Sequence, residues 1–133
     1  MFDYVTCTGS LEHFLDIRAG LREIARTIKP GGKVLIVVPN ADYFLVKLGL
    51  RAGTEQQLIH EVLLPLVAWR RLFEETGLTV RAMTKDSWPV HTHLPWRASS
   101  LRGAVRRLLY ITLFLLLPVS LTYQIVFTLD APA

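Results

Sequence analysis

The sequence feature that most constrains the fold is a run of large aliphatic residues, Lys33–Val38, directly after the turn sequence Lys29–Gly32. Because this run has no polar alternation, it predicts a strand covered on both faces, as in a parallel sheet. Residues 15–28 carry apolar side chains at helical spacing, and Phe2–Thr8 is aromatic and β-branched. These patterns indicate an amphipathic helix preceded by a buried strand. Together the three segments predict a right-handed parallel βαβ unit.

The rest of the chain continues the α/β pattern. A helix is predicted over residues 67–76, ending at Gly77, and a strand over residues 78–83. Residues 41–66 are less regular, and we interpret them as an insertion over the strand ends, in the position of a lid. We expect residues 1–133 to form a single domain, because two domains of ordinary size need a longer chain.

Residues 97–129 form a basic and apolar tail for which two structures are open. Residues 108–129 carry no charge and are long enough to cross a bilayer, with arginines just before them. However, Pro118 interrupts this run, and the residues after it are rich in β-branched and aromatic types. We therefore favour a helix up to Leu117 and a closing strand over residues 122–129. Such a helix can still lie on a membrane surface.

The net charge of +4 is a local feature of this tail. Residues 1–86 contain eleven Lys or Arg and ten Asp or Glu, whereas residues 87–129 contain four arginines and no acid. This pattern favours contact with an anionic surface such as phospholipid head groups, and a solvated helix face is the alternative. No motif that reads nucleic acid accompanies the short basic stretch, so no nucleic-acid partner is predicted.

Five short segments together carry a family resemblance: Phe2–Val5, Ser10–Phe14, Leu21–Arg26, Lys29–Lys33 and Val37–Asn40. In order and spacing they resemble the fourth strand, the following helix and the fifth strand of class I S-adenosylmethionine-dependent methyltransferases. Tyr123–Phe127 resembles the closing antiparallel strand of that family. The resemblance implies an α/β fold with a partial Rossmann-like sheet, strands 4 to 7 of the family fold, and flanking helices.

The same resemblance implies a function. The family transfers a methyl group from S-adenosylmethionine, and we expect a small or lipid-like acceptor. Its Gly-rich turn after the first strand, and its acid at the end of the second, precede the region matched here. We therefore expect this chain to be a truncated, carboxyl-terminal half that is inactive alone. A non-enzymatic protein that contacts a membrane or a partner is the alternative.

Ligands of parallel sheets bind beyond the carboxyl ends of the strands. According to the resemblance, the residues that border the S-adenosylmethionine pocket near its sulfonium are Thr8, Gly9, Ser10 and Leu11. An ordinary strand-to-helix turn with Ser10 as a cap is the alternative. His13 follows at the same end and is the candidate base for a hydroxyl acceptor. In the alternative interpretation, His13 only shapes the pocket and Glu12 caps a helix.

Further candidates lie on and beyond the lid. Tyr43, His60 and Glu61 are the candidates for substrate contact, and a surface helix pair is the alternative for the last two. His91 and His93 have a spacing that suits a metal ion, but no third ligand is nearby in sequence, so no metal site is predicted.

The first predicted strand also bears on association and location. In the complete family fold it neighbours a strand that has no counterpart here, so we expect Phe2–Thr8 to be an exposed edge that self-associates. Asp3 and Glu12 interrupt the amino-terminal segment, which lacks the pattern of a signal peptide. We therefore predict a cytoplasmic protein with peripheral contact to a membrane.

Overall fold

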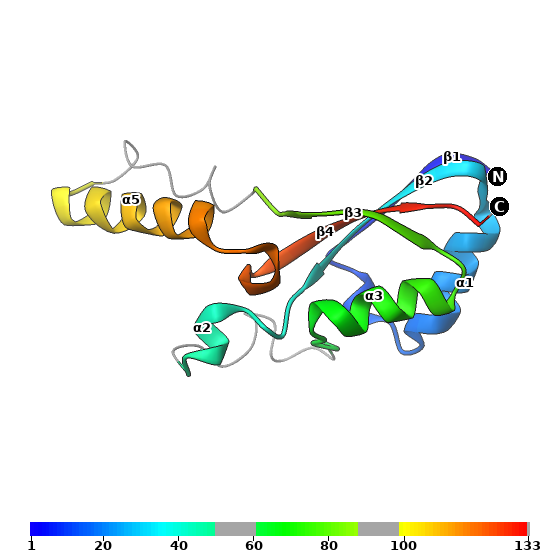
Figure 1. The fold of residues 1–133 in the computed structure, drawn as a ribbon, viewed down its shortest axis with the longest axis horizontal. Coiled ribbons are helices and arrows are strands. Elements are labelled where there is room, and N and C mark those ends of the chain that lie inside the picture. Colours follow the sequence, from blue (N-terminus) through cyan, green and yellow to red (C-terminus); the bar gives the residue numbers. More distant parts are fainter. Residues whose placement is uncertain (50–60, 88–98, 133) are drawn as a thin grey trace.

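The computed structural model describes residues 1–49, 61–87 and 99–132. Within these ranges, the sheet consists of β1 (Phe2–Thr8), β2 (Ile28–Pro39), β3 (Thr79–Lys85) and β4 (Gln124–Asp130). The order across the sheet is β1-β2-β4-β3 (Figure 1). β1 and β2 are parallel, and β4 is antiparallel to both of its neighbours. The predicted parallel βαβ unit and the predicted closing strand are confirmed.

Two helices cover one face of this sheet (Figure 1). α1 (Ile17–Thr27) begins where the side chain of Asp16 accepts a hydrogen bond of 2.9 Å from the backbone N–H of Ala19, which satisfies a free donor of the first turn. α3 (Leu66–Glu75) is followed by Gly77, whose φ of 86° few other residues adopt. The remaining described helices are short or lie at the sheet's end: η1 (Leu11–His13), α2 (Phe44–Lys47), η3 (Val119–Leu121) and α5 (Leu101–Leu116).

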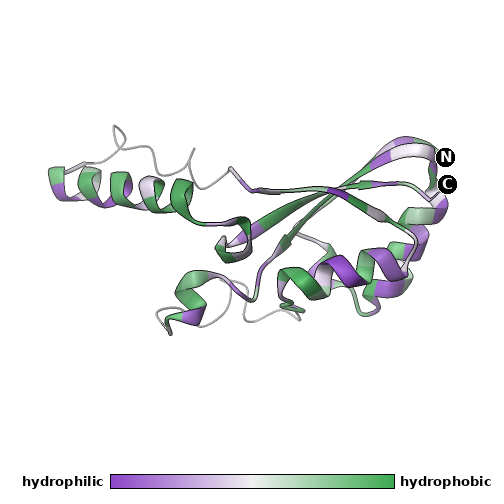
Figure 2. Ribbon diagram, in the orientation of Figure 1, coloured by the Kyte–Doolittle hydropathy of each residue, from purple (hydrophilic) through white to green (hydrophobic). Residues whose placement is uncertain are grey.

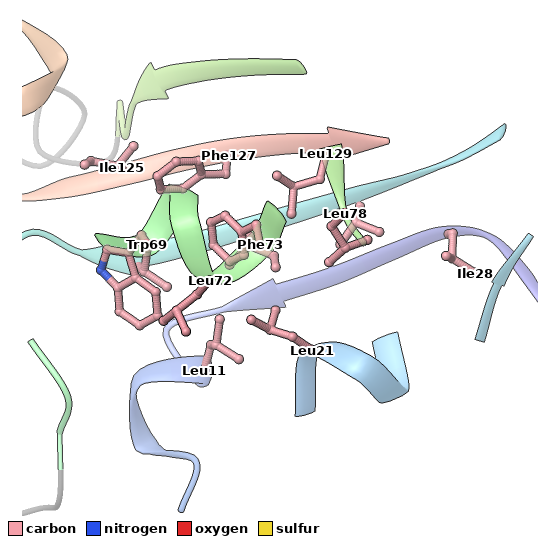
Figure 3. Close-up of a cluster of buried hydrophobic side chains, with 13 residues drawn as sticks. Leu11, Leu21, Ile28, Trp69, Leu72, Phe73, Leu78, Ile125, Phe127 and Leu129 are labelled. Carbon is pink, nitrogen blue, oxygen red and sulfur yellow. The ribbon is translucent and has the colours of Figure 1, made fainter. Parts of the chain in front are cut away.

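The core lies between that sheet face and the two covering helices (Figure 3). Alternate residues of β2 and β4 point into it, so burial alternates along both strands. The ring of Phe73 on α3 meets the ring of Phe127 on β4 edge to face, at 4.9 Å between centroids. Leu21 supplies the contact from α1 and is fully buried. These contacts join α1, α3, β2 and β4 in one hydrophobic cluster.

Two predictions about strand burial are wrong. Val34, Ile36 and Val38 of β2 are fully buried, but Leu35 and Val37 on its other face are only half-buried. The predicted coverage of both faces fails because α1 and α3 pack on the same face. β1 is largely exposed rather than buried, because it forms an edge of the sheet and pairs with β2 alone among the described strands.

The boundary between helix and strand also differs from the prediction at Lys29–Gly32. These residues belong to the first part of β2, and Ile28 already has extended backbone where α1 ends. In the tail, the favoured arrangement is confirmed, because α5 ends at Leu116 and β4 follows after η3. Over the part of the chain that the structure describes, no helix has both the length and the apolar character to cross a membrane.

Candidate functional site

The turn after β1 is the centre of the candidate site. The backbone N–H of Gly9 donates a hydrogen bond of 3.1 Å to the carbonyl oxygen of Val37, which holds the end of β1 beside β2. Gly9 has a φ of 57°, in the left-handed region where an L side chain is strained. Thr8, Gly9 and Ser10 are all exposed. The carboxyl end of β1 therefore presents exposed backbone at a position without a Cβ.

The short helix η1 continues from this turn. The N–H of His13 donates to the carbonyl oxygen of Ser10 at 3.1 Å, and the side chain of Leu11 is fully buried in the core. Ser10 does not cap a helix with its side chain, because its Oγ donates to the carbonyl oxygen of Thr8 at 3.1 Å. The capping role considered for Ser10 is therefore wrong, whereas Leu11 anchors the turn to the core.

Glu12 has an environment that the sequence did not predict. Only 4% of the residue is exposed, and its Oε2 has no hydrogen-bond partner in the described structure. Burial raises the pKa of this carboxyl group, a backbone hydrogen bond at Glu12 and the nearby His13 oppose the shift, and Glu61 adds a smaller increase. Glu12 is therefore not a helix cap, a role that Asp16 takes for α1. A buried acid beside a strand end is a frequent feature of functional sites.

The segment that returns from the predicted lid lies against both strand ends. The N–H of Val62 donates to the carbonyl oxygen of Glu12 at 2.8 Å. Leu64 forms an isolated parallel bridge with Asn40. The structure thus brings Glu61, a predicted substrate contact, to Glu12 and η1. His60, the other candidate beside it, lies outside the described residues, as do His91 and His93.

Asn40, immediately after β2, links the carboxyl end of β2 to the segment just before β4. Its Nδ2 donates to the carbonyl oxygens of Ser120 at 2.8 Å and Thr122 at 2.9 Å. Its Oδ1 accepts from the N–H of Asp42 at 3.0 Å, and the residue is 2% exposed. In the sequence, Asn40 was only the last residue of a segment that carries the family resemblance, with no hydrogen-bonding role predicted. The signal for this role was an amide side chain directly after a buried apolar run.

Tyr43, also predicted to contact substrate, belongs to a different group of residues. It is buried, and its ring meets those of Phe44 and Tyr123 edge to face at centroid distances of 5.1 and 5.3 Å. These three rings line an apolar crevice together with Tyr110 and Phe114 of α5. The structure therefore places His13 on η1 with Glu61 nearby, and Tyr43 beside α5 and the start of β4.

Comparison with known proteins identifies the family. A family model described as a methyltransferase domain matches residues 1–83, which is more than half of the chain. The chain belongs to this family. The match includes β1, α1, β2, α3 and most of β3, and with them the exposed turn at Gly9 and the buried Glu12. The expected family is thereby confirmed.

Relatives of this methyltransferase-domain chain support the assignment. A demethylmenaquinone methyltransferase of Corynebacterium urealyticum is 57% identical over 35 residues, which are 26% of this chain and 15% of that protein. An uncharacterized methyltransferase of Bacillus subtilis is 44% identical over 36 residues, covering 27% of this chain and 14% of the relative. These aligned segments are short compared with either relative.

The solved structures show the fold. A chain from the Haloferax volcanii complex that contains the Trm112 methyltransferase activator superposes with a TM-score of 0.59 at 20% identity. The superposition covers 98% of this chain and 54% of that one, so this chain spans about half the length of its structural relative. A Haemonchus contortus phosphoethanolamine N-methyltransferase with bound S-adenosyl-L-methionine gives 0.57 at 18% identity, covering 99% of this chain and 34% of its own. The expected Rossmann-like methyltransferase sheet with flanking helices is confirmed.

Proposed function

We propose that this chain acts in the transfer of a methyl group from S-adenosylmethionine to a small or lipid-like acceptor. The observation that carries the proposal is the exposed turn of Thr8, Gly9 and Ser10 at the carboxyl end of β1, in a chain of the methyltransferase-domain family. Ligands of parallel α/β sheets bind at this end of the strands. The antiparallel β4 beside β2 gives the sheet the arrangement found in its structural relatives.

The residues at the carboxyl end of β1 fit the cofactor chemically. S-adenosylmethionine supplies a methyl group on a positively charged sulfonium, which backbone carbonyls, hydroxyl oxygens and a nearby carboxylate complement. Thr8 and Ser10 offer hydroxyl and carbonyl oxygens at the exposed turn, and Glu12 carries its carboxyl group close by. The lack of a side chain at Gly9 lets a ligand approach the backbone.

His13 is the residue we propose as the base when the acceptor is a hydroxyl group. It is half-buried, lies one residue from Glu12, and interacts electrostatically with that carboxyl group. An imidazole takes up a proton near neutral pH, and a neighbouring carboxylate stabilises the charged ring that results. Glu61 extends the same acidic surroundings.

The apolar side chains beside α5 favour a lipid-like acceptor by their chemistry, although the crevice that they line has room for only about one water molecule, about 10 Å³. Aromatic residues that follow β2 and precede β4, Tyr43 and Tyr123, form one wall, and Phe114 of α5 forms another. Asp86, just after β3, is the charged residue among its lining. An apolar chain would be stabilised among these side chains by the surface that it removes from water, but only if they move apart to admit it.

Cofactor binding tests the proposal directly. Isothermal titration calorimetry of the 133-residue chain with S-adenosylmethionine is expected to give a measurable heat of binding. Gly9→Ala should weaken it, because the new methyl group occupies the approach to the turn. Gly31→Ala is the matched control, since Gly31 has a φ of 77° but lies near the amino end of β2. Absence of binding by the wild-type chain, or equal losses of affinity in both variants, overturns the proposal that S-adenosylmethionine binds at the carboxyl end of β1.

The role of His13 has a separate test. Because the chain is expected to be inactive alone, it is assayed together with the amino-terminal half of a related methyltransferase. There, with hydroxyl acceptors, His13→Asn is expected to lower the rate of methyl transfer by about 100-fold or more, with unchanged affinity for S-adenosylmethionine. The wild-type rate should also depend on pH between about 5 and 8, and the variant should lose that dependence. Wild-type transfer that is independent of pH in this range contradicts the role.

A further inference from the structure

The outward side of α5 is a large apolar surface that no described part of the chain covers. α5 extends away from the end of the sheet, and most of its ribbon is hydrophobic (Figures 1 and 2). Seven aliphatic residues of α5 are exposed. Leu113 lines the crevice at the sheet's end, and the other six are Leu101, Val105, Leu108, Leu109, Leu115 and Leu116. Leu101 is 82% exposed and Leu116 is 78% exposed, at opposite ends of the helix. We call these six residues the α5 apolar face.

The α5 apolar face is continuous and separate from the contacts that hold the helix. With successive residues about 100° apart, the six side chains fall within one third of the helix circumference. The opposite side carries Tyr110 and Phe114, which line the crevice at the sheet's end. Lys85 of β3 fixes the helix there, because its Nζ donates to the carbonyl oxygens of Phe114 at 2.8 Å and Leu115 at 2.9 Å. The helix is thus anchored at one end while its apolar face stays open.

Positive charge borders the apolar face. Arg102 and Arg106 are exposed and form a shallow groove with Leu101, Val105 and Leu109. α5 contains no acidic residue, and none occurs between residues 87 and 129. A solvated surface helix normally mixes both signs of charge and does not expose several adjacent leucines. The combination instead matches helices that lie in the plane of an anionic bilayer.

We propose that α5 is a membrane-surface helix, with its apolar face in the acyl region and its arginines on anionic phospholipid head groups. The charge of the arginines selects this occupant, since an uncharged apolar partner gains nothing from them. Such binding places the crevice beside Tyr43 and Phe114, at the anchored end of the same helix, close to the lipid surface.

Co-sedimentation with vesicles of defined composition tests the proposal on the whole chain. We expect binding to vesicles of phosphatidylcholine with phosphatidylglycerol, and much weaker binding to phosphatidylcholine alone. Arg102→Gln/Arg106→Gln should lower the partition coefficient about 25-fold, because each arginine near an anionic surface contributes about fivefold. Arg22→Gln/Arg81→Gln, which removes two exposed charges elsewhere, should leave it unchanged. Equal binding to both kinds of vesicle, or equal losses in both pairs of variants, overturns the proposal.

A second pair of variants tests the apolar face. Leu109→Asp should abolish sedimentation with anionic vesicles, whereas Leu48→Asp, at a residue equally exposed at 65%, should not. Circular dichroism verifies that both variants fold. Analytical ultracentrifugation distinguishes the other occupant, a second copy of the chain. If Leu109→Asp converts an oligomer to a monomer and the wild-type chain does not bind vesicles, the α5 apolar face is a contact between copies of the chain. The membrane proposal is then wrong.

Discussion

The side-chain amide of Asn40 donates a hydrogen bond of 2.9 Å to the backbone carbonyl oxygen of Thr122, and both residues are buried. This bond joins the residue after β2 to the residues just before β4, which are 82 positions away in sequence. The backbone pairs there too, because the N–H of Asn40 donates to the carbonyl oxygen of Tyr123 at 3.0 Å. The strand end that carries the candidate site is therefore fixed by the end of the chain.

Replacing Asn40 with alanine is expected to destabilise the fold. Asn40→Ala leaves the carbonyl oxygens of Ser120 and Thr122 without their donor, and each buried unsatisfied group costs about 1–3 kcal/mol. Urea unfolding should show a loss of about 2–4 kcal/mol in the free energy of unfolding. Ser87→Ala, at an exposed position, is the control. A loss of less than half a kcal/mol in Asn40→Ala, the ordinary range of surface changes, contradicts the role given to the amide.

Trp69 allows the contribution of a single buried hydrogen bond to be separated from packing. Its Nε1 donates to the carbonyl oxygen of Pro39 at 2.9 Å, and its ring stacks on Phe73 with 6.3 Å between centroids. Trp69→Phe should cost about 1–3 kcal/mol, from the lost donor and a reduced side-chain volume. Trp69→Ala should cost about 3–5 kcal/mol. Equal losses in the two variants would show that the fully buried ring contributes nothing beyond its donor.

Glu12 is expected to lower stability at neutral pH. Burial raises the pKa of its carboxyl group above the ordinary value of 4.5, so the folded state binds this proton more tightly than the unfolded state does. The free energy of unfolding therefore falls as the pH rises from the unfolded pKa to the folded one, and stays lowered above it. Glu12→Gln removes this penalty and should stabilise the chain by about 1 kcal/mol at pH 7.

Urea unfolding from pH 4 to 8 gives the difference in unfolding free energy between Glu12→Gln and the wild type. This difference tests whether the variant is the more stable one at neutral pH. The difference should be smallest at low pH and grow as the pH rises. Glu23→Gln provides a control of opposite sign, because a hydrogen bond from Arg26 lowers the pKa of Glu23. Its small effect should be a destabilisation that disappears at low pH. A Glu12→Gln variant less stable than the wild type at pH 7 would mean that the contacts of the carboxylate outweigh the cost of its burial, which contradicts the prediction.

Local patterns were enough to predict most of the fold. The aliphatic run at residues 33–38 and the alternating residues at 124–130 both became central strands, because each buries a row of side chains against helices. Pro118 correctly divided helix from strand, since its ring cannot continue a helix. The family model matches the range that holds the five segments between residues 2 and 40 on which the family resemblance mainly rested, whereas Tyr123–Phe127 lies outside it.

The errors concern what neighbours each residue has, which a single sequence does not contain. Whether one or two faces of β2 are covered depends on where both helices pack, and a run of aliphatic residues is compatible with either. For the same reason, the sequence did not predict the polar contacts of the candidate site. The buried position of Glu12 and the links from Asn40 arise from residues 62 and 120–122, which only the folded chain brings there.

The exposed edge of β1 gives a prediction about association. Among the strands that the structure describes, β1 pairs with β2 alone, and Tyr4 on β1 is 77% exposed. An unpaired strand edge binds other strands, so the chain should self-associate at rising concentration in sedimentation velocity experiments. Tyr4→Lys/Thr6→Lys should shift it towards the monomer, because like charges meet when two such edges pair. Val67→Lys/Ser87→Lys adds the same charge at exposed positions away from the edge and should leave association unchanged. A wild-type chain that stays monomeric at all concentrations, or equal shifts in both variants, shows that β1 is not the contact.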